Sequence, residues 1–216
     1  MNSTDSSSCP VKVITKQTTS CAVSAGVSSV YTVSTFGSTE GLTAYFNLCG
    51  VLSSSIYRVF ADMYDEVKVR GVQYRIIVDS PVGSGEGPSD IVLYTSIDRR
   101  IGFSEDAPTT SMIQNVPSTS PYYITNFKTP EWKRYVRAKD VIEKSQFHDC
   151  SYRLSAGSPP TYSDPAFTVA GENPNFFSPG LFFMLGTSDT AYSGAINVTV
   201  QCVYYLTFRN PIAPYI

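Results

Sequence analysis

The chain has 216 residues, of which 42% are hydrophobic and 13% aromatic, so it can bury one substantial core. Its charged residues make up 16%, its formal net charge is −2 and its pI is about 5.4, so it has no overall basic field to attract nucleic acid. No stretch approaches the roughly 18 consecutive apolar residues of a membrane-spanning helix, so membrane insertion is not expected.

The N-terminal part of the chain shows the alternation of β-strands. Residues 1–9 are rich in serine and carry few apolar anchors, which predicts a flexible arm. From Val11 onward, apolar and polar residues alternate with a period of two and start a strand. The strand segments predicted after it are 20–24, which continues the first strand after a kink, 29–36 and 42–48.

One short helix is predicted before the strongest strand. Apolar residues at i, i+3, i+4 and i+7 within 56–63 give the spacing of one helical face, and serines at 53–55 can cap it. Strand 66–78 follows directly. Its alternation shifts phase at Gly71, as a β-bulge would shift it.

The second half of the chain alternates strands with long connections. Residues 79–90 and 149–179 are rich in Pro, Gly and Ser and predict loops, and a short helix is expected at 108–116. The strands predicted in this half are 91–97, 122–127, 133–139, 181–186 and 195–208, followed by an extended arm at 210–216.

Together these elements predict an all-β fold with short helices in the connecting loops. The 15 Tyr and 12 Phe suit pleated, half-buried surfaces. About eight strands with long connections favour a jelly roll, which is an antiparallel β-sandwich, over a tight meander. Without a visible repeat or second domain, we expect one domain at 10–209 between an N-terminal arm at 1–9 and a C-terminal arm at 210–216.

Residues with catalytic or metal-binding potential do not form a recognisable set. His148 is the only histidine, so no second one exists to complete a metal site, and no paired-carboxylate or nucleophile motif is present. We therefore expect no enzymatic activity, no cofactor and no transition-metal site. Asp62, Asp65 and Glu66 could contribute to a calcium site between subunits, but solvated charges at a helix end are the simpler interpretation.

The cysteines favour a reducing compartment. Their number is odd and no C-x-x-C pair occurs, so at least one thiol stays unpaired. They are Cys9, Cys21, Cys49, Cys150 and Cys202.

Two groups of basic residues are candidates for contact with nucleic acid. In the first, basic residues alternate with aromatic ones, and bases can stack on aromatic rings beside charges that neutralise phosphates. Lys12 and Lys16, next to the N-terminal arm, form the second group. For both, the alternative is a strand face that is solvated or paired across an interface. The first group contains Lys133, Arg134, Arg137 and Lys139, with Trp132 and Tyr135 interleaved.

Three segments carry a family resemblance. A helix leads into a strand that reads YDEVKVRGV at 64–72, strand 92–98 ends in Ile97-Asp98, and the following loop and helix contain Ile113-Gln114-Asn115. These segments lie between about 42 and 139. The order of these segments resembles that in the capsid proteins of circovirus-like viruses, which have circular single-stranded DNA genomes.

This resemblance implies a viral jelly-roll subunit that self-assembles into the simplest icosahedral shell, T=1. The shell would enclose a single-stranded DNA genome and attach to a receptor on the host cell. The chain would then be found in the virion, after assembly in the host cell with the nucleus as a candidate site. Such coats usually begin with an arginine-rich arm, whereas residues 1–8 here contain no Lys or Arg. The alternatives are the coat of a small RNA virus and a non-viral receptor- or carbohydrate-binding β-sandwich.

Overall fold

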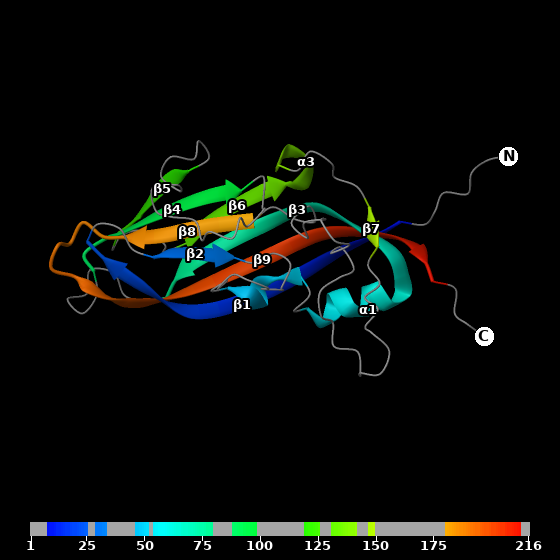
Figure 1. The fold of residues 1–216 in the computed structure, drawn as a ribbon, viewed down its shortest axis with the longest axis horizontal. Coiled ribbons are helices and arrows are strands. Elements are labelled where there is room, and N and C mark those ends of the chain that lie inside the picture. Colours follow the sequence, from blue (N-terminus) through cyan, green and yellow to red (C-terminus); the bar gives the residue numbers. More distant parts are fainter. Residues whose placement is uncertain are drawn as a thin grey trace, which may run out of the picture.

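The computed structural model describes residues 8–25, 29–33, 46–51, 54–79, 88–98, 119–125, 131–141, 147–149 and 180–212. Within these residues the strands form two antiparallel sheets (Figure 1). The first sheet has the order β1 (Cys9–Ser24), β9 (Ser193–Pro211), β3 (Tyr64–Val78) and β6 (Glu131–Arg137), and β7 (His148–Asp149) also pairs with β3. The second has the order β2 (Val30–Val33), β8 (Gly180–Gly186), β4 (Ile91–Asp98) and β5 (Ser120–Ile124).

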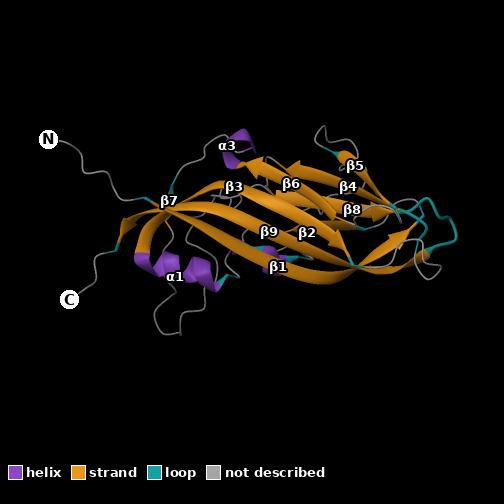
Figure 2. Cartoon of the chain, turned by 180° about the vertical axis from the view of Figure 1, so that it is seen from behind, coloured by secondary structure: helices purple, strands orange, loops and turns teal. Residues whose placement is uncertain are grey.

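The two sheets pack face to face as a β-sandwich, as the views from opposite sides show (Figures 1 and 2). One core cluster unites Tyr74 and Tyr204 of the first sheet with Tyr31 and Phe183 of the second. Tyr31 also links the sheets directly, since its hydroxyl accepts a 2.5 Å hydrogen bond from the Ala22 backbone N–H of β1. The predicted all-β jelly roll of about eight strands is confirmed.

Strand β1 is continuous, so the kink predicted before residue 20 is wrong. Its pairing with β9 runs in one unbroken antiparallel register from Cys9–Phe208 to Ser24–Ser193. The side chains alternate in burial along the whole strand. The alternation is not interrupted, because every residue of β1 has a partner in β9.

The bulge predicted at Gly71 is confirmed. Val69 pairs with Leu206 of β9 and Gly71 with Tyr205, so Arg70 is the extra residue between them. After the bulge, Val72 and Tyr74 continue the buried side of β3. The phase shift therefore keeps the core-facing side of the strand apolar on both sides of the bulge.

The predicted short helix is confirmed as α1 (Ser55–Met63), at the end of the sandwich where β1 begins and β9 ends (Figures 1 and 2). Ser54 occupies the N-cap position, but its side chain makes no capping hydrogen bond. The helix buries Tyr57 and Ala61, and the Tyr57 ring lies 5.9 Å from the ring of Phe208 in β9. Of the apolar residues that predicted the helix, Phe60 also packs against Phe208, with ring centroids 5.4 Å apart, whereas Ile56, Val59 and Met63 are exposed.

Other predicted strands differ from the structure in their bounds. Segment 42–48 ends in the 3₁₀ helix η1 (Asn47–Cys49) rather than in a strand, and its residues 42–45 lie outside the described residues. Strand 133–139 stops at Arg137, because Ala138 begins the one-turn helix α3 (Ala138–Val141), which Arg137 and Asp140 close with an ion pair. Strand β9 continues to Pro211, past the domain boundary predicted at residue 209.

Several predictions fall on segments outside the described residues. These are the arm at 1–7, most of the loop at 79–90, the helix at 108–116, the irregular stretch at 150–179 and the end of the chain at 213–216. Among the helices that are described, none combines the length and apolar character needed to cross a membrane.

Candidate nucleic-acid interface

The first sheet has two faces that differ completely in character. Residues directly opposite each other on neighbouring antiparallel strands project from the same face. On the inner face, Val13, Tyr204, Val72 and Val136 pair in one row, and all four are buried. The side chains one residue away along each strand therefore form the outer face.

Three consecutive rows of this outer face, here called the basic face, contain most of the predicted nucleic-acid residues. The rows are Lys12–Tyr205–Gly71–Arg137, Ile14–Val203–Gln73–Tyr135 and Lys16–Gln201–Arg75–Lys133, each read from β1 through β9 and β3 to β6. Successive rows are about 6.6 Å apart along the strands. The two rows that carry lysine are therefore separated by about 13 Å, with the Tyr135 row between them.

The structure divides the predicted residues between three places. Lys12, Lys16, Lys133 and Arg137 all lie on the basic face, although β1 and β6 are far apart in the sequence. The four come together because β9 and β3 lie between β1 and β6. The predicted basic segment is divided in the structure, because a strand sends alternate side chains to opposite faces of the sheet.

The remaining three predicted residues point elsewhere. Trp132 and Arg134 pair with Ile76 and Tyr74 and so project from the inner face, where Trp132 is 8% exposed. Lys139 is not on a strand at all, because it lies in α3 after β6 has ended. Trp132 is a core residue and offers no ring for a base to stack on.

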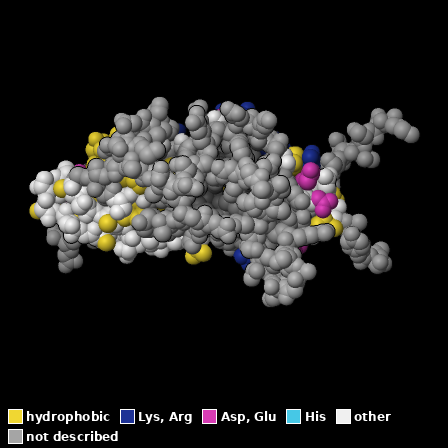
Figure 3. Space-filling model, in the orientation of Figure 1, with side chains coloured by type: hydrophobic (Ala, Val, Ile, Leu, Met, Phe, Trp, Pro, Cys, Tyr) yellow, Lys and Arg dark blue, Asp and Glu magenta, His cyan; other side chains and the backbone are white. Residues whose placement is uncertain are grey.

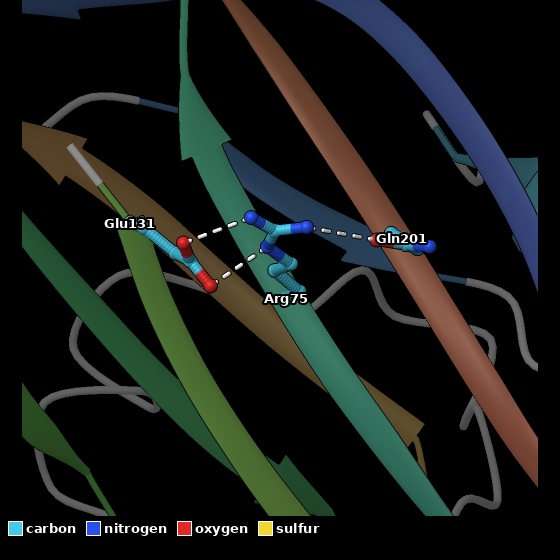
Figure 4. A network of polar contacts seen from close by, with 3 residues as sticks. All are labelled: Arg75, Glu131 and Gln201. Carbon is cyan, nitrogen blue, oxygen red and sulfur yellow. Dashed lines mark hydrogen bonds and ion pairs between the residues drawn. The ribbon is translucent and has the colours of Figure 1, made fainter. Parts of the chain in front are cut away.

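Arg75 lies at the centre of the basic face and was missed by the sequence analysis. Its Nε and Nη2 donate to the two carboxylate oxygens of Glu131 at 2.7 and 2.9 Å, and its Nη1 donates to Gln201 Oε1 at 3.4 Å (Figure 4). This hydrogen bonding raises the pKa of the Arg75 guanidinium and lowers that of the Glu131 carboxyl. The network ties β6, β3 and β9 together across the face and neutralises Glu131.

The lysines of the basic face keep their charge available. Lys12, Lys16 and Lys133 are exposed, and among the described residues none of them lies within ion-pair distance of a carboxylate. The charge of Lys133 does contribute to the lowered pKa of Glu131. On the same sheet face, Glu66 of β3 pairs with Arg209. Beyond the end of β3, the Asp79 carboxylate accepts a hydrogen bond from Thr199. Arg137 is paired with Asp140 at 2.6 Å. The face is therefore locally positive, although the whole chain carries −2.

Tyr135 presents an aromatic ring between the two basic rows. Its side chain is 51% exposed, and its ring meets that of Tyr205 edge-on with centroids 5.6 Å apart. The ring extends over Gly71, where an added Cβ would collide with the Tyr135 hydroxyl and would lie 2.7 Å from its Cζ. The absence of a side chain at Gly71 thus allows the Tyr135 ring to lie across β3.

The predicted acidic cluster does not gather into a metal site. Within the described residues, no group of three His, Cys, Asp or Glu side chains could hold an ion. Glu66 instead accepts hydrogen bonds from Arg209 and from Asn210 Nδ2, the latter at 2.9 Å. The backbone of His148 pairs with Val67, while its side chain lies outside the described part of the chain.

The described cysteines are free thiols, and those in the core are poor nucleophiles. Burial raises the pKa of Cys21 to about 12, although a hydrogen bond with Tyr31 opposes the shift. Burial and hydrogen bonding with Cys49 raise the pKa of Cys202 well above its usual value. These thiols are protonated at neutral pH, so they pack as small apolar side chains. Cys150 lies outside the described residues.

On the side of the molecule drawn in Figure 3, the visible Asp and Glu side chains lie mainly at the right-hand end, with Lys or Arg beside them, and other visible Lys and Arg lie at the upper and lower margins.

No family model matches the chain, and no curated protein matches it in sequence. Its structure is similar to a chain of mud crab tombus-like virus, with 10% identity and a TM-score of 0.50 over 99% of this chain and 94% of that one. It is also similar to a chain of maize chlorotic mottle virus, with 9% identity and a TM-score of 0.50 over 97% of this chain and 98% of that one. At such low identity, the similarity shows that this chain shares the fold of chains from these viruses over nearly its whole length.

Proposed function

We propose that the chain is the coat subunit of a small virus, which assembles with copies of itself into a closed icosahedral shell. The observation that carries this proposal is the two-sheet jelly roll, which matches chains of two virus structures almost from end to end. A match over the full length supports a subunit built like theirs better than a binding module that shares only part of the fold. In this role the chain would form part of the virion and would have no enzymatic activity.

An exposed apolar surface on α1 supports self-assembly. The side chains of Ile56, Val59 and Met63 are 48%, 56% and 51% exposed, and they share one side of the helix. Contiguous apolar surface of this kind is typical of sites where another protein binds. We assign the α1 surface, defined by these three residues, to contact with a second copy of the chain.

The proposal favours an RNA genome over the single-stranded DNA that the sequence resemblance implied. The two virus structures named above support the alternative of a small RNA-virus coat better than the coat of a single-stranded DNA virus. Assembly in the nucleus was tied to a DNA genome and forms no part of this proposal. T=1, the simplest icosahedral arrangement, is the first symmetry to test, and attachment to a host receptor stays part of the proposed role.

The test is particle formation by the purified full chain, observed by negative-stain electron microscopy and light scattering. We expect closed particles of uniform diameter. A chain that stays monomeric, or forms only small oligomers, at every salt concentration and pH tested would contradict the proposal and favour a binding β-sandwich.

A matched pair of variants tests the α1 surface. Val59→Asp places a charge in the apolar surface and should leave folded subunits that do not assemble. Thr190→Asp introduces the same charge in the exposed turn between β8 and β9, at the opposite end of the molecule from α1, and should assemble normally. Normal assembly by Val59→Asp would show that the subunits meet elsewhere.

A further inference from the structure

We infer that the basic face is a docking surface for single-stranded nucleic acid, with the lysines on the phosphates and Tyr135 stacked against a base. This inference rests on the proposed function, because it places the basic face on the inside of the shell. It differs from the usual role of an arginine-rich arm, since it assigns the contact to the folded sheet. The residues that carry it come from both edges and the centre of that sheet.

The first argument is charge. Lys12, Lys16 and Lys133 have no ion-pair partner among the described residues, while the face's acidic Glu131 is neutralised by Arg75. Unpaired lysines on one face repel each other and attract a polyanion, whose counterions are released on binding. The overall charge of −2 means that this attraction is confined to the face rather than spread over the molecule.

The second argument is the position of the exposed aromatic ring. Tyr135 lies in the row between the two rows that carry lysine, so phosphates on either side of a stacked base would have a cation nearby. Single-strand binding surfaces combine a positive track with aromatic platforms in this way. Bases paired in a duplex could not reach the ring, so the arrangement favours unpaired nucleic acid.

The third argument is that the ring is held in place. The edge-on contact with Tyr205 supports one side of the Tyr135 ring. Because Gly71 has no side chain, the hydroxyl end of Tyr135 can lie against the backbone of β3. An ordered ring loses less conformational entropy when a base stacks on it than a mobile one would. An acidic segment of a neighbouring subunit could satisfy the lysines but would make no specific use of this ring.

The experiment measures fluorescence anisotropy of labelled oligouridylate, oligothymidylate and a duplex of equal length with the full chain, over a salt series. Light scattering on the same samples records the assembly state. We expect both single strands to bind more tightly than the duplex. The variant Lys16→Gln/Lys133→Gln should lower the slope of log affinity against log salt by roughly 0.7 for each lysine.

The control removes the same number of charges from exposed residues off the face. Arg58→Gln/Lys139→Gln alters α1 and α3 and should leave affinity and salt slope nearly unchanged. Equal losses in the two double variants, or a loss in neither, would overturn the inference.

The aromatic contact is tested separately. Tyr135→Ala should weaken single-strand binding roughly 5- to 150-fold, whereas Tyr135→Phe, which keeps the ring, should bind almost as the parent chain does. Unchanged binding by Tyr135→Ala would overturn the stacking contact.

The outcomes also separate this inference from the proposed function. If the chain forms closed shells but substitutions in the basic face do not change nucleic-acid binding, the inference is wrong and the proposed function still holds. If Lys16→Gln/Lys133→Gln prevents shells from forming without any nucleic acid present, the lysines pair with a neighbouring subunit and the inference is wrong. A chain that binds through the basic face but never assembles would contradict the proposed function alone.

Discussion

The two faces of the sheet β1-β9-β3-β6 are formed by alternate residues of the same strands. The inner face is buried in the core, and the outer face is at the surface. Tyr74 is fully buried, whereas Arg75, one residue later, spans three strands on the surface. In β6, Trp132 belongs to the core and Lys133 is exposed. Because successive residues of a strand face opposite sides of the sheet, substitutions one residue apart should have unlike effects on stability.

The largest difference is expected at Trp132 and Lys133. Trp132→Ala should lower the free energy of unfolding by about 3–5 kcal/mol, because it leaves a large cavity in the inner face. Lys133→Gln should change it by less than about 0.5 kcal/mol, as exposed substitutions usually do. Urea denaturation of both variants tests this. Similar destabilisation by the two would contradict the division of β6 between the faces.

Gly71→Ala comes next, since it places a methyl group against the Tyr135 ring and 2.8 Å from the Val136 carbonyl oxygen. We expect a loss of about 1–3 kcal/mol from overpacking. The double variant Gly71→Ala/Tyr135→Ala should recover part of this loss, which thermal unfolding can measure. A purely additive double variant would show that the collision with Tyr135 does not cause the effect.

A smaller effect is expected from the buried hydroxyl of Tyr204 on the inner face. It donates to the Cys49 carbonyl oxygen at 2.7 Å, and Thr15 Oγ1 donates to the same oxygen at 2.6 Å. Tyr204→Phe should cost about 0.5–1.5 kcal/mol, because Thr15 still satisfies the carbonyl. Adding Thr15→Val should cost more than the sum of the two single changes, and strict additivity in a double-mutant cycle would argue against this shared acceptor.

The smallest effect belongs to the Arg75–Glu131 ion pair of the basic face. Glu131 has a lowered pKa in the folded chain, so its contribution to stability is present above its ordinary value of 4.5 and is lost as pH falls through the folded pKa. Because both side chains are partly exposed, the change in Tm should be slight. Glu131→Gln should flatten the acid side of the Tm-against-pH curve. An unchanged curve would mean that other carboxyls dominate it.

Patterns within single stretches of the sequence were sufficient to predict the positions of most strands and of the bulge in β3. Period-two alternation located most strands, and the phase shift at Gly71 identified the bulge. The orientation of α1 could not be predicted, because it depends on Phe208, which arrives from the far end of the chain. The supposed kink in β1 was wrong for the same reason, since β9 keeps that strand continuous.

The candidate interface was only partly predictable. Lys12 was named for its position next to the N-terminal arm, and Lys133 for its place among basic and aromatic residues. The cross-strand register that places them on one face joins residues almost 200 positions apart. Arg75 and Tyr205 were missed because only that register brings them beside Tyr135. Strand alternation alone could have separated Trp132 and Arg134 from Lys133, which was a signal present in the sequence.

The most direct test is a cryo-electron microscopy reconstruction of particles assembled by the full chain with a single-stranded oligonucleotide. The basic face should then line the interior, with nucleic-acid density against Tyr135 and the lysines, and the α1 surface should lie between subunits. A closed shell with the basic face on its exterior, or with nucleic acid bound only elsewhere, would contradict the assignment of nucleic-acid binding to the basic face. Failure to form any particle would contradict the coat function itself.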